Sequence, residues 1–286
     1  MRVLVTGATG FVGYHVIHAL LATNTVEVIA TAIDADNAKT KDWYDKVTFI
    51  PFSIDEQSIE QTHNLYTYFR LPDAVIHLAW EGLPNYMQLF HFERVLPRQF
   101  MFLKKLIEQG VLNVNVIGTC LEYGMREGKL SEAMYTKPNT AYGLAKDTLR
   151  RQLDILRGQV DFDLKWIRLF YVYGIGQNPN SLIAQLDKAI DRGDTTFNMS
   201  GGEQQRDYLA IERAARYITA ITLQDDVVGI INCCSGKPIT VNALVDNRIK
   251  ERNAAIQLNK GVYPYLDFEP FAFWGDNTKL KKIISR

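Results

Sequence analysis

A tyrosine and a lysine four positions apart, Tyr142 and Lys146, are the residues of this sequence best suited to proton transfer. On a helix this spacing places both side chains on one face, about one turn apart. A tyrosine with an ordinary pKa of about 10 is a poor acid–base group at neutral pH. A neighbouring ammonium favours its phenolate, so the pair predicts acid–base chemistry on a hydroxyl or carbonyl group.

A third side chain, Thr119, carries a hydroxyl that can join this pair. The apolar residues 114–117 before it predict a buried strand, and Thr119 lies in the motif GTCLEYG at 118–124. Sheets of this kind bind ligands at the C-terminal ends of their strands. We therefore expect the Thr119 hydroxyl to hydrogen-bond a substrate carbonyl or alcohol.

A glycine-rich segment near the start of the chain predicts a phosphate-binding loop. Residues 6–13 read TGATGFVG, between an apolar segment and a helical pattern. Glycines there allow a tight turn and let backbone N–H groups approach a pyrophosphate, while the helix N-terminus favours negative charge. The residues expected to bind a dinucleotide here are Gly7, Thr9, Gly10, Phe11 and Val12.

Apolar segments that alternate with amphipathic ones must position these groups. We expect strands at 3–5, 26–30, 47–50, 74–79, 114–117 and 164–170, and helices at 11–21, 100–109 and 139–156. Such a pattern predicts an α/β fold with a doubly wound parallel sheet, the Rossmann type. After Gly174 the chain is richer in Gly, Asn and Pro. We therefore expect a dinucleotide-binding domain at 1–174 and 205–235, with a small discontinuous substrate-binding lobe at 175–204 and 236–286.

The end of the second predicted strand leaves the choice between NADH and NADPH open. An acid there would bond the ribose 2′-hydroxyl and favour NAD, whereas a nearby Arg would favour NADP. Ala32 stands near the expected position and Asp34 lies slightly beyond it. Asp34 is therefore either a ribose contact or an ordinary loop residue.

The composition excludes several classes of protein. Lys+Arg and Asp+Glu both number 32, without the basic surplus of a nucleic-acid-binding protein. No apolar run approaches the roughly 18 residues of a membrane span, and the first residues do not resemble a secretory signal. Cys120, Cys233 and Cys234 lack a metal-binding spacing. We therefore expect a cytoplasmic protein with reduced thiols and no bound metal.

These motifs together resemble the extended short-chain dehydrogenase/reductases, a group of nucleotide-sugar epimerases, dehydratases and reductases. The matching segments span nearly the whole chain: 6–13, 75–79, 118–124, 142–146, 168–174, 205–208 and 275–279. The resemblance implies an NAD(P)H cofactor, a nucleotide-sugar substrate and a homodimer. It also implies that Thr119, Tyr142 and Lys146 form the catalytic triad.

The resemblance also assigns binding residues. Further cofactor contacts are expected from Asp34, Ser53, Ile54, Leu78, Ala79, Trp80, Tyr142 and Lys146. Ser53 departs from the Asp of many relatives, although its hydroxyl can still accept a hydrogen bond from adenine. Substrate contacts are expected from Pro84, Tyr86, Thr119, Tyr142, Tyr171, Asn180 and Arg206.

Arg206 has two interpretations. In the resembled family, the matching arginine typically contacts the nucleotide diphosphate. The alternative is an ion pair with one of two neighbouring acids, Asp207 or Glu203, because most such charges are simply solvated.

The positions next to Thr119 bear on the reaction type. The 4,6-dehydratases of the group place Asp and Glu there to serve as acid and base, but this chain has Cys120 and Leu121. Epimerase/reductases of the GDP-fucose synthase kind add a Cys/His pair, whereas this chain has Leu121 and Gly176 at those places. Dehydration and carbon epimerisation by proton abstraction are therefore disfavoured.

What remains is hydride transfer with one proton. The segments 118–124 and 197–204 most resemble reductases of dTDP- or CDP-linked 4-keto-6-deoxyhexoses, which make deoxysugars for bacterial surface polysaccharides such as the lipopolysaccharide O-antigen. We therefore expect an NAD(P)H-dependent 4-ketoreductase. A 4-epimerase or 4,6-dehydratase is the alternative, followed by a non-catalytic NADP(H)-binding regulator, which often lacks the Tyr or Lys retained here.

Overall fold

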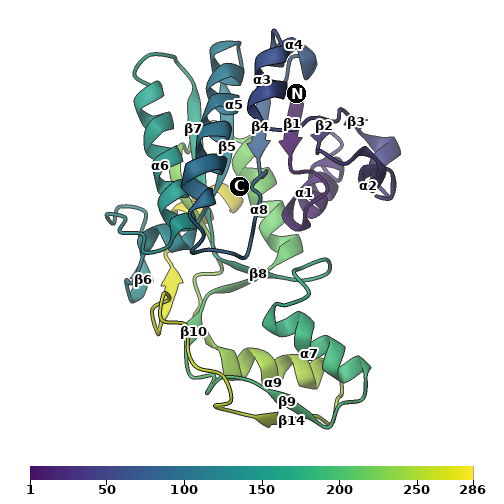
Figure 1. Ribbon diagram of the computed structural model, residues 1–286, viewed down its shortest axis with the longest axis vertical. Coiled ribbons are helices and arrows are strands. Elements are labelled where there is room, and N and C mark those ends of the chain that lie inside the picture. Colours follow the sequence, from purple (N-terminus) through teal and green to yellow (C-terminus); the bar gives the residue numbers. More distant parts are fainter. Residues whose placement is uncertain (286) are drawn as a thin grey trace.

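A seven-stranded parallel sheet forms the centre of the molecule in the computed structural model, which describes residues 1–285 (Figure 1). From one edge to the other its strands are β12 (Gly229–Cys233), β7 (Asp163–Leu169), β5 (Asn113–Thr119), β4 (Ala74–His77), β1 (Arg2–Thr6), β2 (Glu27–Thr31) and β3 (Thr48–Phe49). The predicted doubly wound α/β fold is confirmed. The strand order reverses beside β1, so the carboxyl ends of β1 and β4 meet at a topological switch point.

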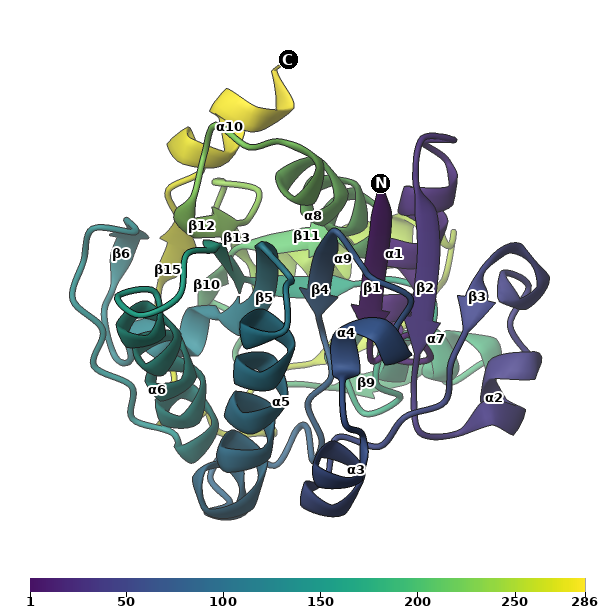
Figure 2. The same cartoon turned by 90° about the horizontal axis from the view of Figure 1, so that it is seen from above.

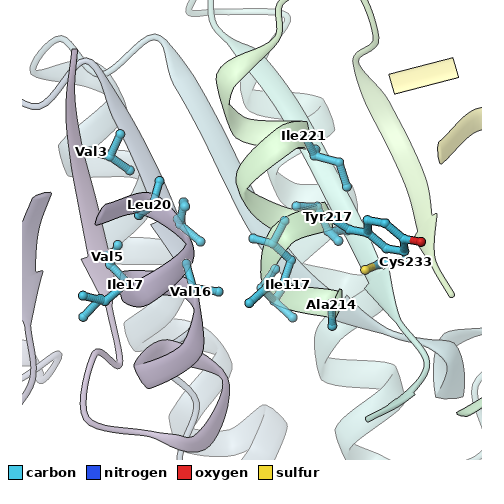
Figure 3. Packing of buried hydrophobic residues seen from close by; sticks show 14 of the residues in the cluster. Val3, Val5, Val16, Ile17, Leu20, Ile117, Ala214, Tyr217, Ile221 and Cys233 are labelled. Carbon is cyan, nitrogen blue, oxygen red and sulfur yellow. The ribbon is translucent and has the colours of Figure 1, made fainter. Parts of the chain in front are cut away.

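Helices cover both faces of the sheet (Figure 2). One face packs against α1 (Phe11–Leu21), α8 (Ile211–Leu223) and α10 (Thr278–Ile284), and the other against α3 (Glu56–Gln61), α4 (Leu65–Tyr68), α5 (Leu96–Glu108) and α6 (Ala141–Leu156). Strand side chains alternate between these layers: Val3 and Val5 face α1, whereas Leu4 belongs to the opposite cluster. Figure 3 shows the first layer, where side chains of α1 and α8 pack over β1 and β5.

The predicted boundaries of helices agree best with the observed ones where the apolar pattern is long. The predicted helix 11–21 matches α1, and 139–156 nearly matches α6. Helix α5 begins before the predicted residue 100, because a π-helical turn at His91–Val95 runs directly into it. The short helices α2 (Ala35–Lys39), α3 and α4 were not predicted, since too few residues carry a periodic pattern.

A third hydrophobic cluster lies apart from the sheet, at the bottom of Figure 1. It packs α7 (Leu182–Asp191) and α9 (Val241–Glu251) against the parallel strands β9 (Thr196–Asn198) and β14 (Gln257–Asn259). These elements fall within the ranges predicted for the lobe, whereas α10 packs on α8 and β12 instead. Residue 286, the end of the predicted lobe, lies outside the described residues. The two-domain division stays a prediction.

Short strand pairs join the lobe to the sheet. They are β8 (Tyr171–Tyr173) with β11 (Tyr208–Ala210), β10 (Gln205–Arg206) with β13 (Ile239–Thr240), and β6 (Gly128–Leu130) with β15 (Phe273–Gly275). Within residues 1–285, no helix is long and apolar enough to cross a membrane. The same residues contain no group of three or more His, Cys, Asp or Glu side chains that could hold a metal ion.

Candidate functional site

Thr119 ends β5 and begins a single helical turn, Cys120–Tyr123. Its hydroxyl accepts a hydrogen bond from the Leu121 amide at 3.3 Å, and its own amide donates to Glu122 Oε1 at 2.9 Å. This reciprocal pair is a capping box, which fixes the turn and the orientation of the Thr119 side chain. The hydroxyl is thereby held at the strand end where the sequence predicted it.

Glu122, to which the sequence analysis gave no role, anchors this turn. Its carboxylate is completely buried and accepts hydrogen bonds from Arg168 Nε at 2.7 Å and Trp166 Nε1 at 2.9 Å. Both partners lie on β7, the neighbouring strand. An unpaired buried carboxylate would be costly, so the ion pair and the capping bonds together stabilise the end of β5.

The N-terminus of α6 brings Tyr142 toward Thr119. Thr140 caps the helix by accepting from the Gly143 amide at 3.0 Å, and the Tyr142 amide donates to the Tyr86 carbonyl at 2.9 Å. Gly143 is required here, because a Cβ would lie 2.8 Å from the Leu121 carbonyl oxygen. The close approach of α6 to the turn after β5 places the Tyr142 phenol beside the Thr119 hydroxyl.

The Tyr142 side chain is buried, and this burial sets its protonation state. Burial raises the pKa of the Tyr142 phenol well above its usual range, while a hydrogen bond with the Thr119 hydroxyl lowers it in part. Without cofactor or substrate, the phenol therefore carries its proton at neutral pH. This is the form that can donate a proton to a developing alkoxide.

Lys146 lies one turn further along α6 and is also buried. Its ammonium donates to the Ile117 carbonyl at 2.8 Å, and its nitrogen lies 5.9 Å from the centre of the Tyr142 ring. Burial lowers the pKa of Lys146 to about 7, although the charge of Glu122 acts in the opposite direction. The structure thus brings together the three residues predicted as a catalytic triad; their roles stay predictions.

The predicted phosphate loop is a tight turn packed against the end of β4. Gly7 has φ +67°, and a Cβ there would lie 2.9 Å from the Ala79 amide nitrogen, while a Cβ at Gly13 would lie 2.2 Å from the Gly7 carbonyl oxygen. The Thr6 hydroxyl accepts from the amides of Leu78 and Ala79, which fastens the loop to the end of β4. Among the described residues, no side chain caps α1, so its first amides stay available for a phosphate.

The loop glycines are therefore required by the close packing of the loop against Ala79 and against the start of α1. The remaining predicted loop residues, Thr9, Gly10, Phe11 and Val12, form the turn and the first residues of α1. An NAD-type cofactor would be held by this loop and by residues at the ends of β2 and β4.

At the end of β2, Asp34 has a structural role. Its Oδ1 accepts from the amides of Asp36 and Asn37 and caps α2. Ala32 is buried and presents no polar side chain. The capping bonds explain Asp34 without a cofactor, and its contact with ribose stays a prediction. Ser53 and Ile54 follow β3, with Ile54 packed against the cluster around α5.

Arg206 is buried, and most of its hydrogen-bonding capacity is used. Its Nε and Nη2 donate to Glu269 Oε2 at 3.2 and 2.9 Å. Its Nη1 donates to the carbonyls of Gln205 and Phe271. Because a guanidinium has five N–H donors, these bonds leave one for another ligand.

The expected alternative partners of Arg206, Asp207 and Glu203, are wrong. Asp207, between β10 and β11, instead accepts from the Ser235 and Gly236 amides in the loop after β12. The partner that the structure shows, Glu269, is far away in the sequence and was not recognised.

The other predicted substrate residues fall into two places. Tyr86 lies against Tyr142, with ring centres 5.7 Å apart, and Tyr171 lies 5.9 Å from the Arg206 guanidinium. Pro84 is exposed in the loop before Tyr86. Asn180 belongs to the lobe, where it lines an open hollow of about 380 Å³ with α7, β9 and Tyr263. Asn180 would therefore contact a different part of a long substrate from the part that Tyr86 and Tyr142 would contact.

The residues after Thr119 offer little further acid–base chemistry. Burial raises the pKa of the Cys120 thiol well above its usual range, and Leu121 has no proton to transfer. Cys120 packs in a cluster with Tyr123 and Phe170. Its thiol is therefore a packing group.

Comparisons with known proteins agree with this geometry. The model of the NAD dependent epimerase/dehydratase family matches residues 3–234. The dTDP-6-deoxy-L-talose 4-dehydrogenase (NAD(+)) of Aggregatibacter actinomycetemcomitans is 27% identical over 281 residues, covering 96% of this chain and 99% of that protein. The GDP-6-deoxy-D-talose 4-dehydrogenase of the same organism is 25% identical over 241 residues, covering 82% and 75%. Among solved structures, MoeE5 in complex with UDP-glucose and NAD has a TM-score of 0.82 at 23% identity, covering 100% of this chain and 92% of that one.

Proposed function

This chain belongs to the NAD-dependent epimerase/dehydratase family, whose members modify nucleotide sugars, and we propose that it reduces the 4-keto group of a nucleotide-linked 4-keto-6-deoxyhexose. The observation that carries the proposal is the set of groups around Tyr142. Thr119, Tyr142 and Lys146 can bind and protonate one oxygen, whereas Cys120 and Leu121, the two positions after Thr119, offer no further acid or base. A reduction needs only a hydride and one proton.

When bound, reduced NAD(P) supplies the hydride to C4 of the sugar. The Thr119 hydroxyl hydrogen-bonds the C4 oxygen and orients the carbonyl. As negative charge develops on that oxygen, the phenol O–H bond of Tyr142 breaks and its proton joins the oxygen. Ketone, hydride and proton together give the alcohol, and Tyr142 becomes a phenolate.

The Lys146 ammonium stabilises that phenolate through its positive charge. The Ile117 carbonyl and the packing around Lys146 keep the ammonium on the side of α6 that faces Tyr142. Because burial lowers the pKa of Lys146 to about 7, its proton can also return to Tyr142 after turnover. The Glu122 carboxylate keeps Thr119 in place and does not itself touch the substrate.

One relative supports a thymidine nucleotide, whereas other similar proteins are named for GDP- or UDP-linked sugars. The 27% identical protein, by its name, acts at C4 of dTDP-6-deoxy-L-talose with NAD(+). A 4-dehydrogenation is the reverse of a 4-keto reduction and uses the same groups. We therefore propose a dTDP-linked substrate, with CDP as the alternative, and a hollow beside Asn180 that receives the nucleotide end.

A 4-epimerase would use the same triad, and it is the alternative that the family itself presents. The two differ in the fate of the cofactor: an epimerase keeps its NAD and re-reduces the sugar, whereas a reductase consumes one NAD(P)H for each sugar. The 4,6-dehydratase and the non-catalytic regulator have no comparable support from the residues around Tyr142.

The experiment that tests the proposal is a panel of dTDP-, CDP-, GDP- and UDP-4-keto-6-deoxyhexoses offered with NADH or NADPH. We expect oxidation of the cofactor with at least one of these sugars, and a single alcohol epimer by NMR. Cofactor oxidation that does not depend on any sugar, or no oxidation with any of them, would contradict the proposal. We further propose a cytoplasmic homodimer that serves deoxysugar synthesis for surface polysaccharide; sedimentation velocity tests the dimer.

A further inference from the structure

The Lys146 ammonium lies over the face of a tryptophan that no part of the mechanism above uses. Its Nζ is 4.0 Å from the centre of the Trp80 ring. Lys146 itself is almost completely buried, and its one hydrogen bond within the described residues runs to the Ile117 carbonyl. A desolvated ammonium with so few hydrogen bonds gains from an aromatic face, whose quadrupole attracts positive charge.

The plane of the Trp80 indole is fixed by a histidine. Trp80 Nε1 donates to His91 Nδ1 at 3.1 Å, and His91 Nε2 lies 3.0 Å from the Asn85 carbonyl oxygen. Indole N–H can only donate and a carbonyl can only accept. His91 must therefore be the neutral tautomer with its proton on Nε2, and both of its nitrogen atoms are used.

The same two rings also border Tyr142. The ring centre of Trp80 is 5.9 Å from that of Tyr142, and the ring centre of His91 is 5.3 Å from it. His91 begins the π-helical turn that precedes α5 and is completely buried. Trp80, just after β4, thus contacts both members of the Tyr-Lys pair, and His91, just before α5, contacts Tyr142.

We propose that Trp80 and His91 are positioning residues for Lys146: His91 orients the indole, and the indole face holds the ammonium beside Tyr142. The catalytic meaning of this inference rests on the proposed function. The contacts among Lys146, Trp80 and His91 do not depend on it. Without the indole face, the ammonium would be less stable in its buried place. Without His91, the indole would lose its hydrogen-bond acceptor and its fixed plane.

Charged and titratable groups from several elements face Lys146. Glu122 favours the ammonium, and Tyr142 does so once it becomes a phenolate. His77 and His91 stay neutral, because burial and the charge of Lys146 both lower their pKa values. Below neutral pH, protonation of His91 would place a hydrogen on Nδ1 and break its bond to Trp80.

The test measures Lys146 directly, in full-length protein with NAD⁺ bound. Lysine labelled with ¹³C at Cε is titrated by NMR, and the Lys146 signal is assigned with Lys146→Arg. In Trp80→Leu we expect the pKa of Lys146 to fall by roughly 0.5 to 1.5 pH units, the range between the loss of an exposed and of a desolvated cation–π contact. His91→Phe, which removes both nitrogen atoms, should give a smaller fall in the same direction.

Two further variants separate a specific effect from general loosening. Trp80→Phe keeps an aromatic face but lacks the N–H, so it should retain part of the effect. Trp43→Phe changes an equally large, fully buried tryptophan in the cluster around α1, and it should leave the Lys146 titration unchanged. If Trp80→Leu fails to fold, Trp80→Phe and His91→Phe still decide the question.

The turnover data give a second readout. With the sugar that the panel identifies, the alkaline limb of the kcat/KM profile should lie at the lowest pH in Trp80→Leu, at an intermediate pH in His91→Phe and at the highest pH in the wild type. A Lys146 pKa in Trp80→Leu within about 0.2 units of the wild-type value would overturn the inference. A shifted Lys146 pKa in a protein that reduces none of the sugars would overturn the proposed function and support this inference.

Discussion

Arg206 and Glu269 form a buried ion pair, with Nη2 and Oε2 2.9 Å apart. The Arg206 guanidinium lies beside the rings of Tyr171 and Phe273. Glu269 lies on the segment between β14 and β15, where the Phe268 ring also contacts Tyr86. A diphosphate that used Arg206 would meet the Glu269 carboxylate as a competitor of the same charge. Binding at Arg206 therefore requires Glu269 to move or to share the guanidinium.

This relationship predicts the effect of Glu269→Gln on substrate binding. The amide keeps a hydrogen-bond acceptor for Arg206 but removes the competing charge. KM for the nucleotide sugar should fall about threefold to tenfold, a difference of up to roughly 1.4 kcal/mol, with kcat little changed. Steady-state kinetics check this, with Glu203→Gln, an exposed acid of the same region, as the control. An unchanged or higher KM with a lower Tm would show that the ion pair is architectural.

The role of Tyr142 as proton donor predicts a large loss in Tyr142→Phe. Removing the donor should lower kcat on the order of 10²-fold or more, while cofactor affinity measured by fluorescence titration stays largely intact. Cys120→Ser changes a buried group beside Thr119 and should keep turnover within about tenfold of wild type. Near-full activity in Tyr142→Phe would show that another group supplies the proton.

The pH dependence of reduction should follow Lys146. Its pKa in the folded protein is lowered to about 7 by burial, so the ammonium is present below that pH and is lost as the pH rises. Because reduction needs the ammonium beside the developing phenolate, kcat/KM should decline above about pH 7. A profile measured from pH 5.5 to 9.5 tests this. A rate that instead rises through this range would contradict the role assigned to Lys146.

The cofactor site should discriminate weakly between NADH and NADPH. Ala32 is buried and apolar, and the Asp34 carboxylate is partly occupied by the amides that it caps. Neither a strong repulsion of a 2′-phosphate nor a dedicated arginine is provided at the end of β2. Titration of each reduced cofactor gives the ratio of dissociation constants. A preference above about 10³-fold, roughly 4 kcal/mol, would mean that another residue reads the ribose.

The sequence predicted the fold well because its signals are local. The glycine loop and a long periodic segment define α1, and continuous apolar runs define the buried strands. The π-helical turn before α5 was missed, since five residues starting at His91 carry no distinctive pattern. The candidate triad was found because its motifs have fixed spacings.

The rest of the site depends on pairs that the sequence does not bring together. Glu122 meets Arg168 on another strand, and Arg206 meets Glu269 across the lobe junction. A glutamate five residues after a predicted strand and an arginine on the next predicted strand could have suggested the first pair. The pair of Arg206 and Glu269 could not be predicted, because it depends on the path of loops that carry no periodic signal. The same is true of the bond between Trp80 and His91.

The most direct test of the reductase assignment measures stoichiometry and isotope uptake in one reaction. The enzyme is incubated in heavy water with NAD(P)H and the 4-keto-6-deoxyhexose nucleotide that it accepts, and the product is analysed by NMR. Hydride from the cofactor and a proton from Tyr142 suffice, so we expect one NAD(P)H oxidised per alcohol formed. Deuterium at C3 and C5 should not exceed the nonenzymatic background. Enzyme-dependent deuterium at C5, or water released from a dTDP-hexose without net NAD(P)H consumption, would contradict the assignment and favour an epimerase or dehydratase.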